Sequence, residues 1–261
     1  MKLNKLLSNK YFRQNFWEFS LILQDVLWIK KEDIYLKDIE ISKYQFLKIK
    51  KKYNKFVKQK IPIEYVLWYT FFMWEKFIVN KNVLIPRPET EYLVKYALNK
   101  TKDIDLIFDI WTGSGVIWIM LGKLTWKKVI LSDISKKALK IAKKNAKIIC
   151  KNCKLEFILS DLWNHLEKYN WNKLICANLP YVDKKFKLDK YTSKEPKLAL
   201  FAKENGLFFY KKLLNQIKWK FLFEVTSKQA MLMKKINWNF EILPTCHKNI
   251  KILYGEKNVS N

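Results

Sequence analysis

A turn that contains two glycines occupies residues 111–115 (Trp-Thr-Gly-Ser-Gly), between the apolar run 106–110 and a helical pattern that begins at Val116. Such a turn lets backbone N–H groups approach a ligand at a helix N-terminus, where negative charge is favoured. Asp133 ends the next apolar run, 18 residues after Gly115. At that position an acid can accept hydrogen bonds from both hydroxyls of a ribose; the alternative is an N-cap for the following helix. Together the turn and the acid predict a nucleoside-bearing cofactor.

A second polar motif, Asn178-Leu179-Pro180-Tyr181, follows the apolar run 174–177. The Asn178 side chain and the carbonyls of Leu179 and Pro180 offer several acceptors beside an aromatic wall, Tyr181. Such a set can hold both N–H groups of a planar NH2 and turn its nitrogen toward a cofactor. The alternative is a turn that only closes a strand.

These motifs need a scaffold that brings them together, and the hydrophobic pattern supplies one. Apolar runs alternate with helical patterns, which predicts crossover units and a mostly parallel sheet. We expect strands at 106–110, 129–133, 155–159, 174–177 and 221–225, and helices at 89–99, from 116, at 136–149 and around 208–217. The last residues, 240–243 and 250–254, predict an antiparallel pair.

Upstream of the sheet the pattern is helical. Phe12, Phe16, Phe19, Leu23 and Leu27 recur at spacings typical of one helix face, and the lysine-rich run 48–60 predicts a further helix. Aromatic and β-branched residues then predict a hairpin-like connector. We therefore predict an α/β protein with a small helical domain at 1–62, a β-hairpin connector at 63–88, and an α/β domain at 89–261.

The composition of the 261 residues excludes a disordered or disulfide-stapled protein, since 49% are hydrophobic and only four are cysteines. The net charge is +27, but Arg13 and Arg87 are the only arginines among 51 basic residues. Protein surfaces that bind phosphate groups usually contain arginine as well as lysine, because the arginine side chain can bind phosphate with two hydrogen bonds. A solvated lysine coat and a nucleic-acid surface therefore both remain open, and direct nucleic-acid binding is possible but not required.

The glycine and tryptophan counts are unusual. Ordinary usage of about 7% glycine predicts roughly 18 glycines, whereas the chain has 5 glycines and 11 tryptophans. We hypothesise that many of these tryptophans are glycines in the cell, encoded by a codon such as UGA that the organism reads as glycine.

Neither a metal site nor a targeting segment is expected. Cys150 and Cys153 have ligand-like spacing, but no second pair completes a zinc site, so we expect free thiols in a reducing cytosol. The N-terminus lacks the apolar core of a signal peptide. The most apolar window, 65–74, is too short for a membrane span. We expect a soluble, cytoplasmic protein with no membrane partner.

These motifs resemble the class I, S-adenosylmethionine-dependent methyltransferases, and specifically the release-factor glutamine N5-methyltransferases. The most distinctive match is residues 85–91, Ile-Pro-Arg-Pro-Glu-Thr-Glu; further matches are 109–115, Asp133, 160–162, 178–181, 195–196, 199–200 and 206–207. The resemblance begins near residue 60, and the helical part before it matches in kind only.

The resemblance implies a Rossmann-like, seven-stranded methyltransferase domain and methyl transfer to the glutamine side-chain nitrogen in a Gly-Gly-Gln motif of peptide-chain release factors. It implies that S-adenosylmethionine is held by Trp111, Thr112, Gly113, Ser114, Gly115, Asp133, Asp161, Leu162 and Asn178. Asn178, Leu179, Pro180 and Tyr181 would hold the substrate amide, with Asn178, Pro180 and Tyr181 at the reacting group. The N-terminal domain would recognise the partner.

The sequence departs from this family at two places. Leu179 stands where the family has proline, and Asn-Leu-Pro-Tyr is the spelling of ribosomal-RNA adenine dimethyltransferases. Trp111 stands where the family has glycine, as do Trp68, Trp74 and Trp219, while Trp126 and Trp238 occupy turn-like contexts. The alternatives are therefore a nucleic-acid adenine methyltransferase and, if Trp111 is literal, a non-catalytic binding protein.

Overall fold

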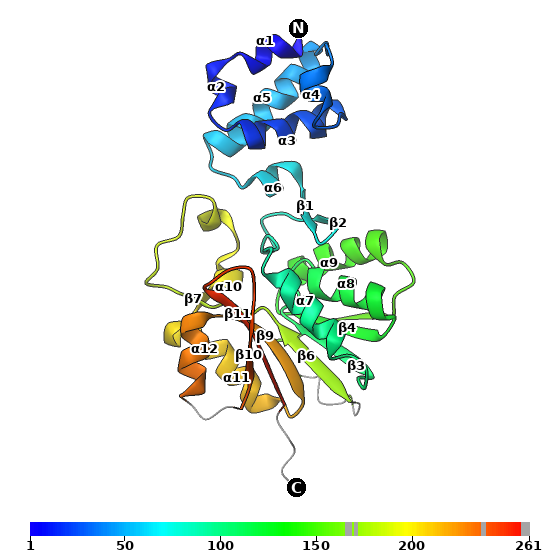
Figure 1. The fold of residues 1–261 in the computed structure, drawn as a ribbon, viewed down its shortest axis with the longest axis vertical. Helices are drawn as coiled ribbons and strands as arrows, with labels where there is room; N and C mark the ends of the chain where they lie inside the picture. Colours follow the sequence, from blue (N-terminus) through cyan, green and yellow to red (C-terminus); the bar gives the residue numbers. More distant parts are fainter. Residues whose placement is uncertain (165–168, 170–171, 236–238, 257–261) are drawn as a thin grey trace. The chain divides into compact units, whose positions relative to one another are not determined.

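A computed structural model of the chain describes residues 1–164, 169, 172–235 and 239–256 (Figure 1). The chain divides into two compact units. The first comprises residues 1–68 together with 189–194, and the second comprises 69–188 and 195–261. In the described part of the chain, no helix combines the length and apolar character needed to cross a membrane.

The first unit is helical. Its helices are α1 (Leu3–Leu7), α2 (Lys10–Arg13), α3 (Phe16–Leu27), α4 (Asp33–Leu36), α5 (Lys43–Val57) and α6 (Ile63–Leu67). The rings of Phe12 and Phe19 stack at 4.5 Å between centroids, and Tyr53 packs against both. This aromatic cluster joins α2, α3 and α5 and forms the core of the unit.

Helix α5 begins five residues before the lysine-rich run from which it was predicted. Ser42 and Gln45 form a capping box, in which each side chain bonds the backbone N–H of the other residue. A distant segment also joins this unit, because Tyr191 stacks on Phe56 with ring centroids 5.1 Å apart. Hydrophobic periodicity carries no signal for such a long-range contact.

The second unit opens with a two-stranded antiparallel hairpin, β1 (Tyr69–Phe72) and β2 (Glu75–Ile78). The predicted connector at 63–88 therefore contains this hairpin, but residues 63–67 of it form helix α6 and belong to the first unit. Tyr65, Val66 and Leu67 of α6 are buried at three consecutive positions, whereas a half-buried strand buries every second residue.

A seven-stranded sheet forms the centre of the second unit, in the order β10-β11-β9-β6-β3-β4-β5. Its strands are β3 (Leu106–Ile110), β4 (Lys128–Asp133), β5 (Leu155–Leu159), β6 (Lys173–Ala177), β9 (Lys220–Thr226), β10 (Glu241–Pro244) and β11 (Ile250–Glu256). The first five run parallel to one another, and β11 is antiparallel to both of its neighbours, β9 and β10. The predicted seven-stranded Rossmann-like fold is confirmed.

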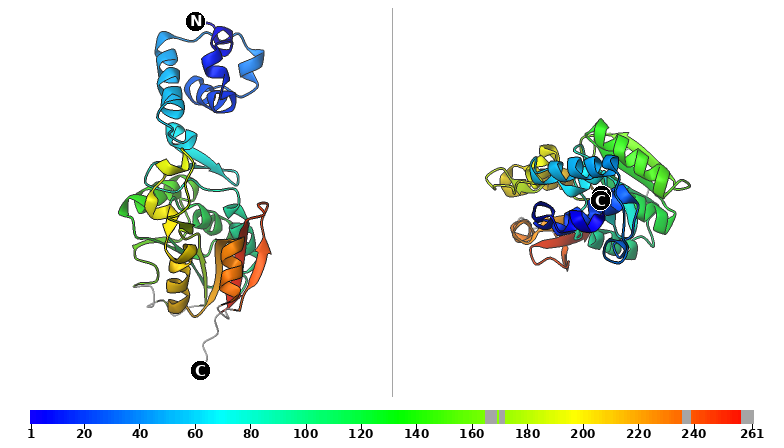
Figure 2. Two further views of the ribbon diagram at one scale, coloured as in Figure 1. Left: turned by 90° about the vertical axis from the view of Figure 1, so that its left-hand side faces the viewer. Right: turned by 90° about the horizontal axis from the view of Figure 1, so that it is seen from above.

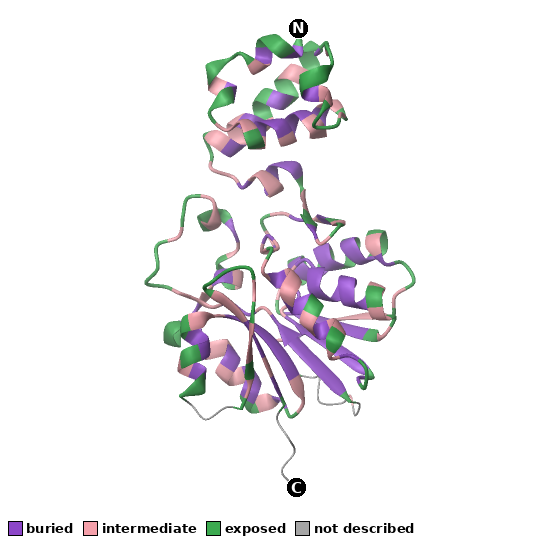
Figure 3. Cartoon of the chain, in the orientation of Figure 1, coloured by how far each residue is buried: buried purple, intermediate pink, exposed green. Residues whose placement is uncertain are grey.

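Helices cover both faces of this sheet (Figures 1 and 2). On one face α7 (Thr90–Asn99), α8 (Val116–Thr125) and α9 (Lys136–Ile149) contribute to one buried apolar cluster, and on the other α11 (Phe208–Gln216) and α12 (Ser227–Lys234) contribute to a second. Ile107 belongs to the first cluster and its neighbours Leu106 and Phe108 to the second, as the alternation of a strand requires. The central strands are buried (Figure 3).

Shorter elements follow the sheet's fourth parallel strand. They are the strand pair β7 (Val182–Asp183) and β8 (Phe201–Ala202), α10 (Lys197–Leu200), and single 3₁₀ turns at 192–194 and 204–206. They lie between β6 and α11 in the chain.

Several tryptophans stand where helices end. Trp28, Trp68 and Trp126 directly follow α3, α6 and α8 in the left-handed conformation, with φ of 57°, 73° and 58°. All three side chains are exposed. Glycine is the usual residue here because it has no Cβ to clash. These conformations support the hypothesis that these tryptophans are glycines in the cell. Trp74 and Trp219 have ordinary φ values, and Trp238 lies outside the described residues.

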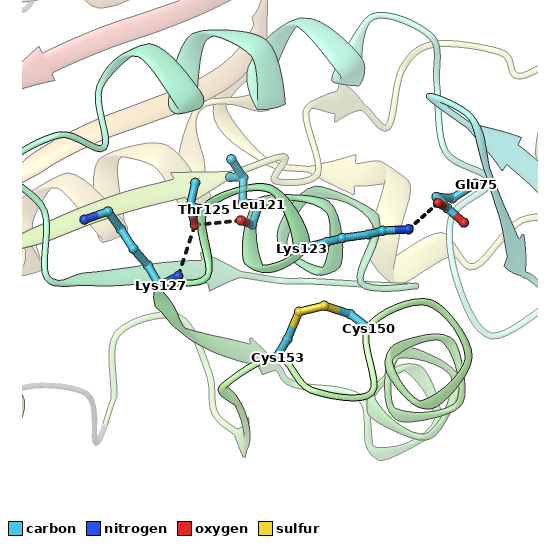
Figure 4. Close-up of a disulfide and its surroundings, with 7 residues drawn as sticks. All are labelled: Glu75, Leu121, Lys123, Thr125, Lys127, Cys150 and Cys153. Carbon is cyan, nitrogen blue, oxygen red and sulfur yellow. Dashed lines mark hydrogen bonds and ion pairs between the residues drawn. A yellow bond between two sulfur atoms is a disulfide. The ribbon is translucent and has the colours of Figure 1, made fainter.

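The expectation of free thiols is wrong for one cysteine pair. Cys150 and Cys153 form a disulfide after α9 (Figure 4). Their Cα atoms are 5.4 Å apart, within the range of roughly 4.4–6.8 Å that a disulfide spans. The turn between α9 and β5 brings them together, a geometry that spacing alone left open. Cys176 and Cys246 are free.

Candidate active site

A cavity lies at the carboxyl ends of three neighbouring parallel strands, β3, β4 and β6. Polar residues that follow these strands line it. Of the residues predicted to bind a ligand, those on its wall are Trp111, Thr112, Gly113, Ser114, Asp133, Asn178 and Pro180. In open parallel sheets, ligands usually bind at this edge. The sheet therefore joins the two predicted motifs in one site.

The turn after β3 and the acid after β4 are held together by backbone hydrogen bonds. The Gly113 N–H donates to Asp133 Oδ2 at 2.9 Å, and the Ser135 N–H donates to Asp133 Oδ1 at 2.8 Å. Burial raises the pKa of the Asp133 carboxyl, and these two N–H groups oppose the shift. The N-cap alternative for Asp133 is wrong, because the Ser135 side chain caps α9 by accepting from Ala138.

Two glycines of this turn are required for different reasons. Gly113 has φ of 57°, and no atom lies within 4 Å of the position that a Cβ would occupy, so its backbone faces open space in the cavity. Gly115 has φ of 85° and begins α8, where a Cβ would lie 2.7 Å from Ile119 Cδ1. Gly115 therefore shapes the turn from behind and does not line the cavity.

Trp111 is the least suitable residue in this turn. It also has a positive φ, 64°, and its indole packs against the ring of Phe209 with centroids 4.7 Å apart. The cavity measures about 100 Å³, whereas small-molecule sites usually measure roughly 300–1,000 Å³. Trp111 is one of the residues on the wall of this cavity. The open backbone at Gly113 and the donors around Asp133 fit a nucleoside-bearing group, and the indole reduces the room for it.

Asp109, on β3 beneath the turn, is fully buried. Burial raises its pKa well above the usual range, while Thr112 and Trp118 act in the opposite direction. This carboxyl does not line the cavity.

Asn178 lies at the centre of a buried polar network. Its Nδ2 donates to Glu224 Oε1 at 3.0 Å and to Thr90 Oγ1 at 3.2 Å. The Thr90 hydroxyl donates to Glu224 Oε2 at 2.7 Å. Burial raises the pKa of Glu224 to about 7. Sequence reasoning missed Glu224, although a single acid inside the apolar run 221–225 is a signal that could have found it.

The other residues of the Asn178 motif face different surroundings. Pro180 lines the cavity, whereas Leu179 is buried and its carbonyl accepts from the Tyr210 hydroxyl at 3.1 Å. Tyr181 does not line this cavity; it lines a separate one, and its carbonyl accepts from Gln229 Nε2 at 2.8 Å. Burial raises the pKa of Tyr181. The roles predicted for Leu179 and Tyr181 remain predictions.

Asp161 and Leu162, predicted to flank an adenine, are not on the wall of the main cavity. Asp161 forms an ion pair with Lys212 at 2.9 Å, and Leu162 is buried in the core with a positive φ of 53°. Their roles in cofactor binding remain predictions.

The motif at 85–91 meets the later signature at 195–200. Arg87 Nη2 lies 2.5 Å from Glu195 Oε1, and the Ile85 N–H donates to Glu195 Oε2 at 2.9 Å. Both motifs line the cavity, through Pro86, Arg87, Thr90, Pro196, Leu198 and Ala199. Two matches that are 108 residues apart in sequence therefore form one wall.

Curated relatives match most of the chain. The release factor glutamine methyltransferase of Lactococcus lactis subsp. lactis is 38% identical over 205 residues, which is 74% of this chain and 74% of that protein. The protein of the same name in Borreliella burgdorferi is 39% identical over 214 residues, 78% of this chain and 72% of that protein. The chain belongs to the release factor glutamine methyltransferase family.

Two other comparisons agree with a methyltransferase fold. A family model described as ribosomal protein L11 methyltransferase matches residues 90–179 of this family member. A crystal structure of a methyltransferase from Pyrococcus furiosus is 14% identical, with a TM-score of 0.52, over 70% of this chain and 89% of that one. At this identity the structural match establishes the fold alone, so the chemistry is argued from the site.

Proposed function

We propose that this protein transfers the methyl group of S-adenosylmethionine to the side-chain amide nitrogen of a glutamine, the one in the Gly-Gly-Gln motif of peptide-chain release factors. The observation that carries the proposal is that Asn178 and Asp133 line the same cavity. The side-chain oxygen of Asn178 can accept a hydrogen bond from a substrate amide, and the carboxylate of Asp133 can accept hydrogen bonds from ribose hydroxyls. Relatives named for release factor glutamine methylation support the substrate.

The residues that would hold S-adenosylmethionine are the turn 111–115 and Asp133. Asp133 has lone pairs beyond those used by Gly113 and Ser135 to accept from two ribose hydroxyls. The open backbone beside Gly113 would accommodate the methionine end. When bound, the cofactor supplies an electrophilic methyl group on a sulfonium.

The protein's own task is to orient a weak nucleophile. An amide nitrogen is a weak nucleophile because its lone pair is delocalised. The rate enhancement therefore comes from aligning that lone pair with the methyl group and from stabilising the positive charge that develops on nitrogen. The oxygen of Asn178 and the carbonyl of Pro180 would accept from the two N–H groups of the substrate amide. The chain needs no covalent nucleophile for this reaction.

The helical first unit would contribute to recognising the release factor, and the lysine-rich surface would favour acidic or nucleic-acid-associated partners. A ribosomal-RNA adenine substrate is the second candidate, because Leu179 gives the motif the spelling of that enzyme class. Both substrates present a planar NH2 group, so the cavity alone does not separate them.

The test offers both substrates to the full chain with methyl-labelled cofactor. Mass spectrometry should find one added methyl group on the glutamine of the release factor's Gly-Gly-Gln motif and no label in ribosomal RNA. Asn178→Ala should reduce turnover by roughly 100-fold, since it removes an orienting acceptor. A release factor with that glutamine replaced by alanine is the control. Label in RNA alone would refute the proposal.

A further inference from the structure

The buried network behind Asn178 has only one satisfactory hydrogen arrangement when Glu224 is ionised. An ionised carboxylate only accepts hydrogen bonds, so the Thr90 hydroxyl must give its proton to Glu224 Oε2 across 2.7 Å. Thr90 Oγ1 is then left as an acceptor for Asn178 Nδ2, 3.2 Å away. Glu224 Oε1 accepts the second proton of the same amide at 3.0 Å.

This arrangement selects one of the two orientations of the Asn178 amide. With the amide turned over, its oxygen would face the Glu224 carboxylate and the Thr90 oxygen with no proton between them. Buried polar contacts without a proton are costly, because the groups have lost their water. Both supporting side chains are buried, Glu224 at 0% exposure and Thr90 at 2%. In the described part of the chain, no protein donor bonds to the Asn178 oxygen.

We propose that Glu224 and Thr90 are positioning residues that fix the Asn178 carboxamide with its nitrogen turned into the protein and its oxygen free to accept from a substrate N–H. The inference rests on the proposed function for the identity of that substrate, a planar amide. The Glu224–Thr90–Asn178 network itself is a property of the chain without substrate.

The network is braced from a second side. The Tyr210 hydroxyl lies 2.5 Å from the main-chain carbonyl of Glu224 and 3.1 Å from that of Leu179. It therefore joins β9 to the turn that contains Asn178. This contact holds the backbone of Glu224 and the backbone next to Asn178 in a fixed relative position. We therefore expect substitutions of the Glu224 or Thr90 side chain to change the orientation of the Asn178 amide without displacing β9.

The first experiment measures the amide directly. With [15N]asparagine labelling, the Asn178 side-chain signal is assigned by its loss in Asn178→Asp. Its protons should exchange with water much more slowly than those of exposed Asn4, and Glu224→Gln should shift both protons and remove their pH titration. Exchange as fast as that of Asn4, or a spectrum unchanged by Glu224→Gln, would overturn the inference. This readout needs no activity.

The second experiment measures methylation of release factor. Thr90→Val removes the hydroxyl at constant shape and should lower kcat by about tenfold, as expected for one lost orienting hydrogen bond, with the cofactor KM unchanged within about twofold. Thr90→Ser should retain kcat within about twofold. Thr101→Val is the matched control, because Thr101 donates only to the Leu98 carbonyl at 2.9 Å, after α7.

The outcomes separate the two proposals. An unmodified chain that leaves the release factor unmethylated refutes the proposed function, while the amide spectrum still decides the positioning role. An active chain whose folded Thr90→Val and Glu224→Gln variants keep full kcat refutes the positioning role alone. Circular dichroism establishes whether each variant is folded. If Glu224→Gln does not fold, the kcat of Thr90→Val alone tests the positioning role.

Discussion

The Arg87 guanidinium lies 2.5 Å from the Glu195 carboxylate, and this contact joins the two segments that form one wall of the cavity. The Glu195 side chain is only 2% exposed, and its second oxygen accepts from the Ile85 N–H. A buried carboxylate requires such partners because it has lost its water. The pair thus fixes the loop at 195–199 to the motif at 85–91.

Removing Arg87 should therefore destabilise the protein more than removing both charges. Arg87→Met leaves the buried Glu195 carboxylate without its cation and should lower the free energy of unfolding by about 3 kcal/mol. Adding Glu195→Gln to Arg87→Met should restore more than half of this loss, since glutamine still accepts from Ile85. Urea unfolding followed by circular dichroism measures both variants. An equal loss in the single and double variants would contradict this interpretation.

Replacing Trp111 with glycine should improve cofactor binding. The substitution removes an indole from the cavity wall and a side chain from a left-handed position. We expect the affinity for S-adenosylhomocysteine to rise by about tenfold, or about 1.4 kcal/mol, in isothermal titration calorimetry. Trp126→Gly is the control, because Trp126 has the same backbone conformation and is not on the cavity wall. Unchanged affinity in Trp111→Gly would show that the indole does not obstruct the site.

Two exposed tryptophans of one helix should respond to glycine with opposite signs. Trp28→Gly, at the left-handed end of α3, should raise the free energy of unfolding by about 1 kcal/mol. Trp17→Gly, in the first turn of α3, should lower it by about 0.5–1 kcal/mol. Urea unfolding of the two variants measures this difference. If both substitutions change the free energy of unfolding in the same direction, backbone conformation does not control the change.

The glycine hypothesis has a separate and direct check in the gene. If tryptophan stands for a recoded glycine, the codons of Trp28, Trp68, Trp111 and Trp126 should be UGA. Mass spectrometry of the protein from its own organism should then find glycine at these four positions. Eleven UGG codons would contradict the hypothesis.

Glu224 should make stability and activity depend on pH in opposite directions. Its pKa is about 7 in the folded protein and ordinarily 4.5, with Glu89 raising and Arg87 lowering it and the Tyr181 and Tyr210 hydroxyls nearby. Between these values the folded state holds a proton that the unfolded state has lost. The free energy of unfolding therefore falls, by roughly 3 kcal/mol, as pH rises from 4.5 to 7.

Activity should rise over the same region, since only the ionised carboxylate fixes the Asn178 amide with both protons inward. Glu224→Gln should flatten both profiles near pH 7. Urea unfolding and initial-rate measurements from pH 5 to 9 check the two slopes. A Glu224→Gln variant with the same slopes as the original chain would assign the titration to another group.

Local signals were sufficient for much of the fold. The apolar runs 106–110 and 155–159 became strands at those residues. The strand at 106–110 is buried throughout, and a parallel strand covered on both faces is typically a nearly continuous apolar run. The start of α5 was predicted too late, since its capping box lies outside the lysine-rich run. The site was predicted only in part: Asp133 and Asn178 line the cavity, whereas Asp161 and Tyr181 do not.

The sequence by itself determined the order of strands and helices, the polar residues at the strand ends and the family, because periodicity and short motifs are local. Only the tertiary structure decided which of those residues share a cavity and what lies behind them. Thr90 and Glu224 are 134 positions apart. Their hydrogen bond exists because the packing of α7 against β9 brings the two side chains together, and no short-range pattern encodes that distance.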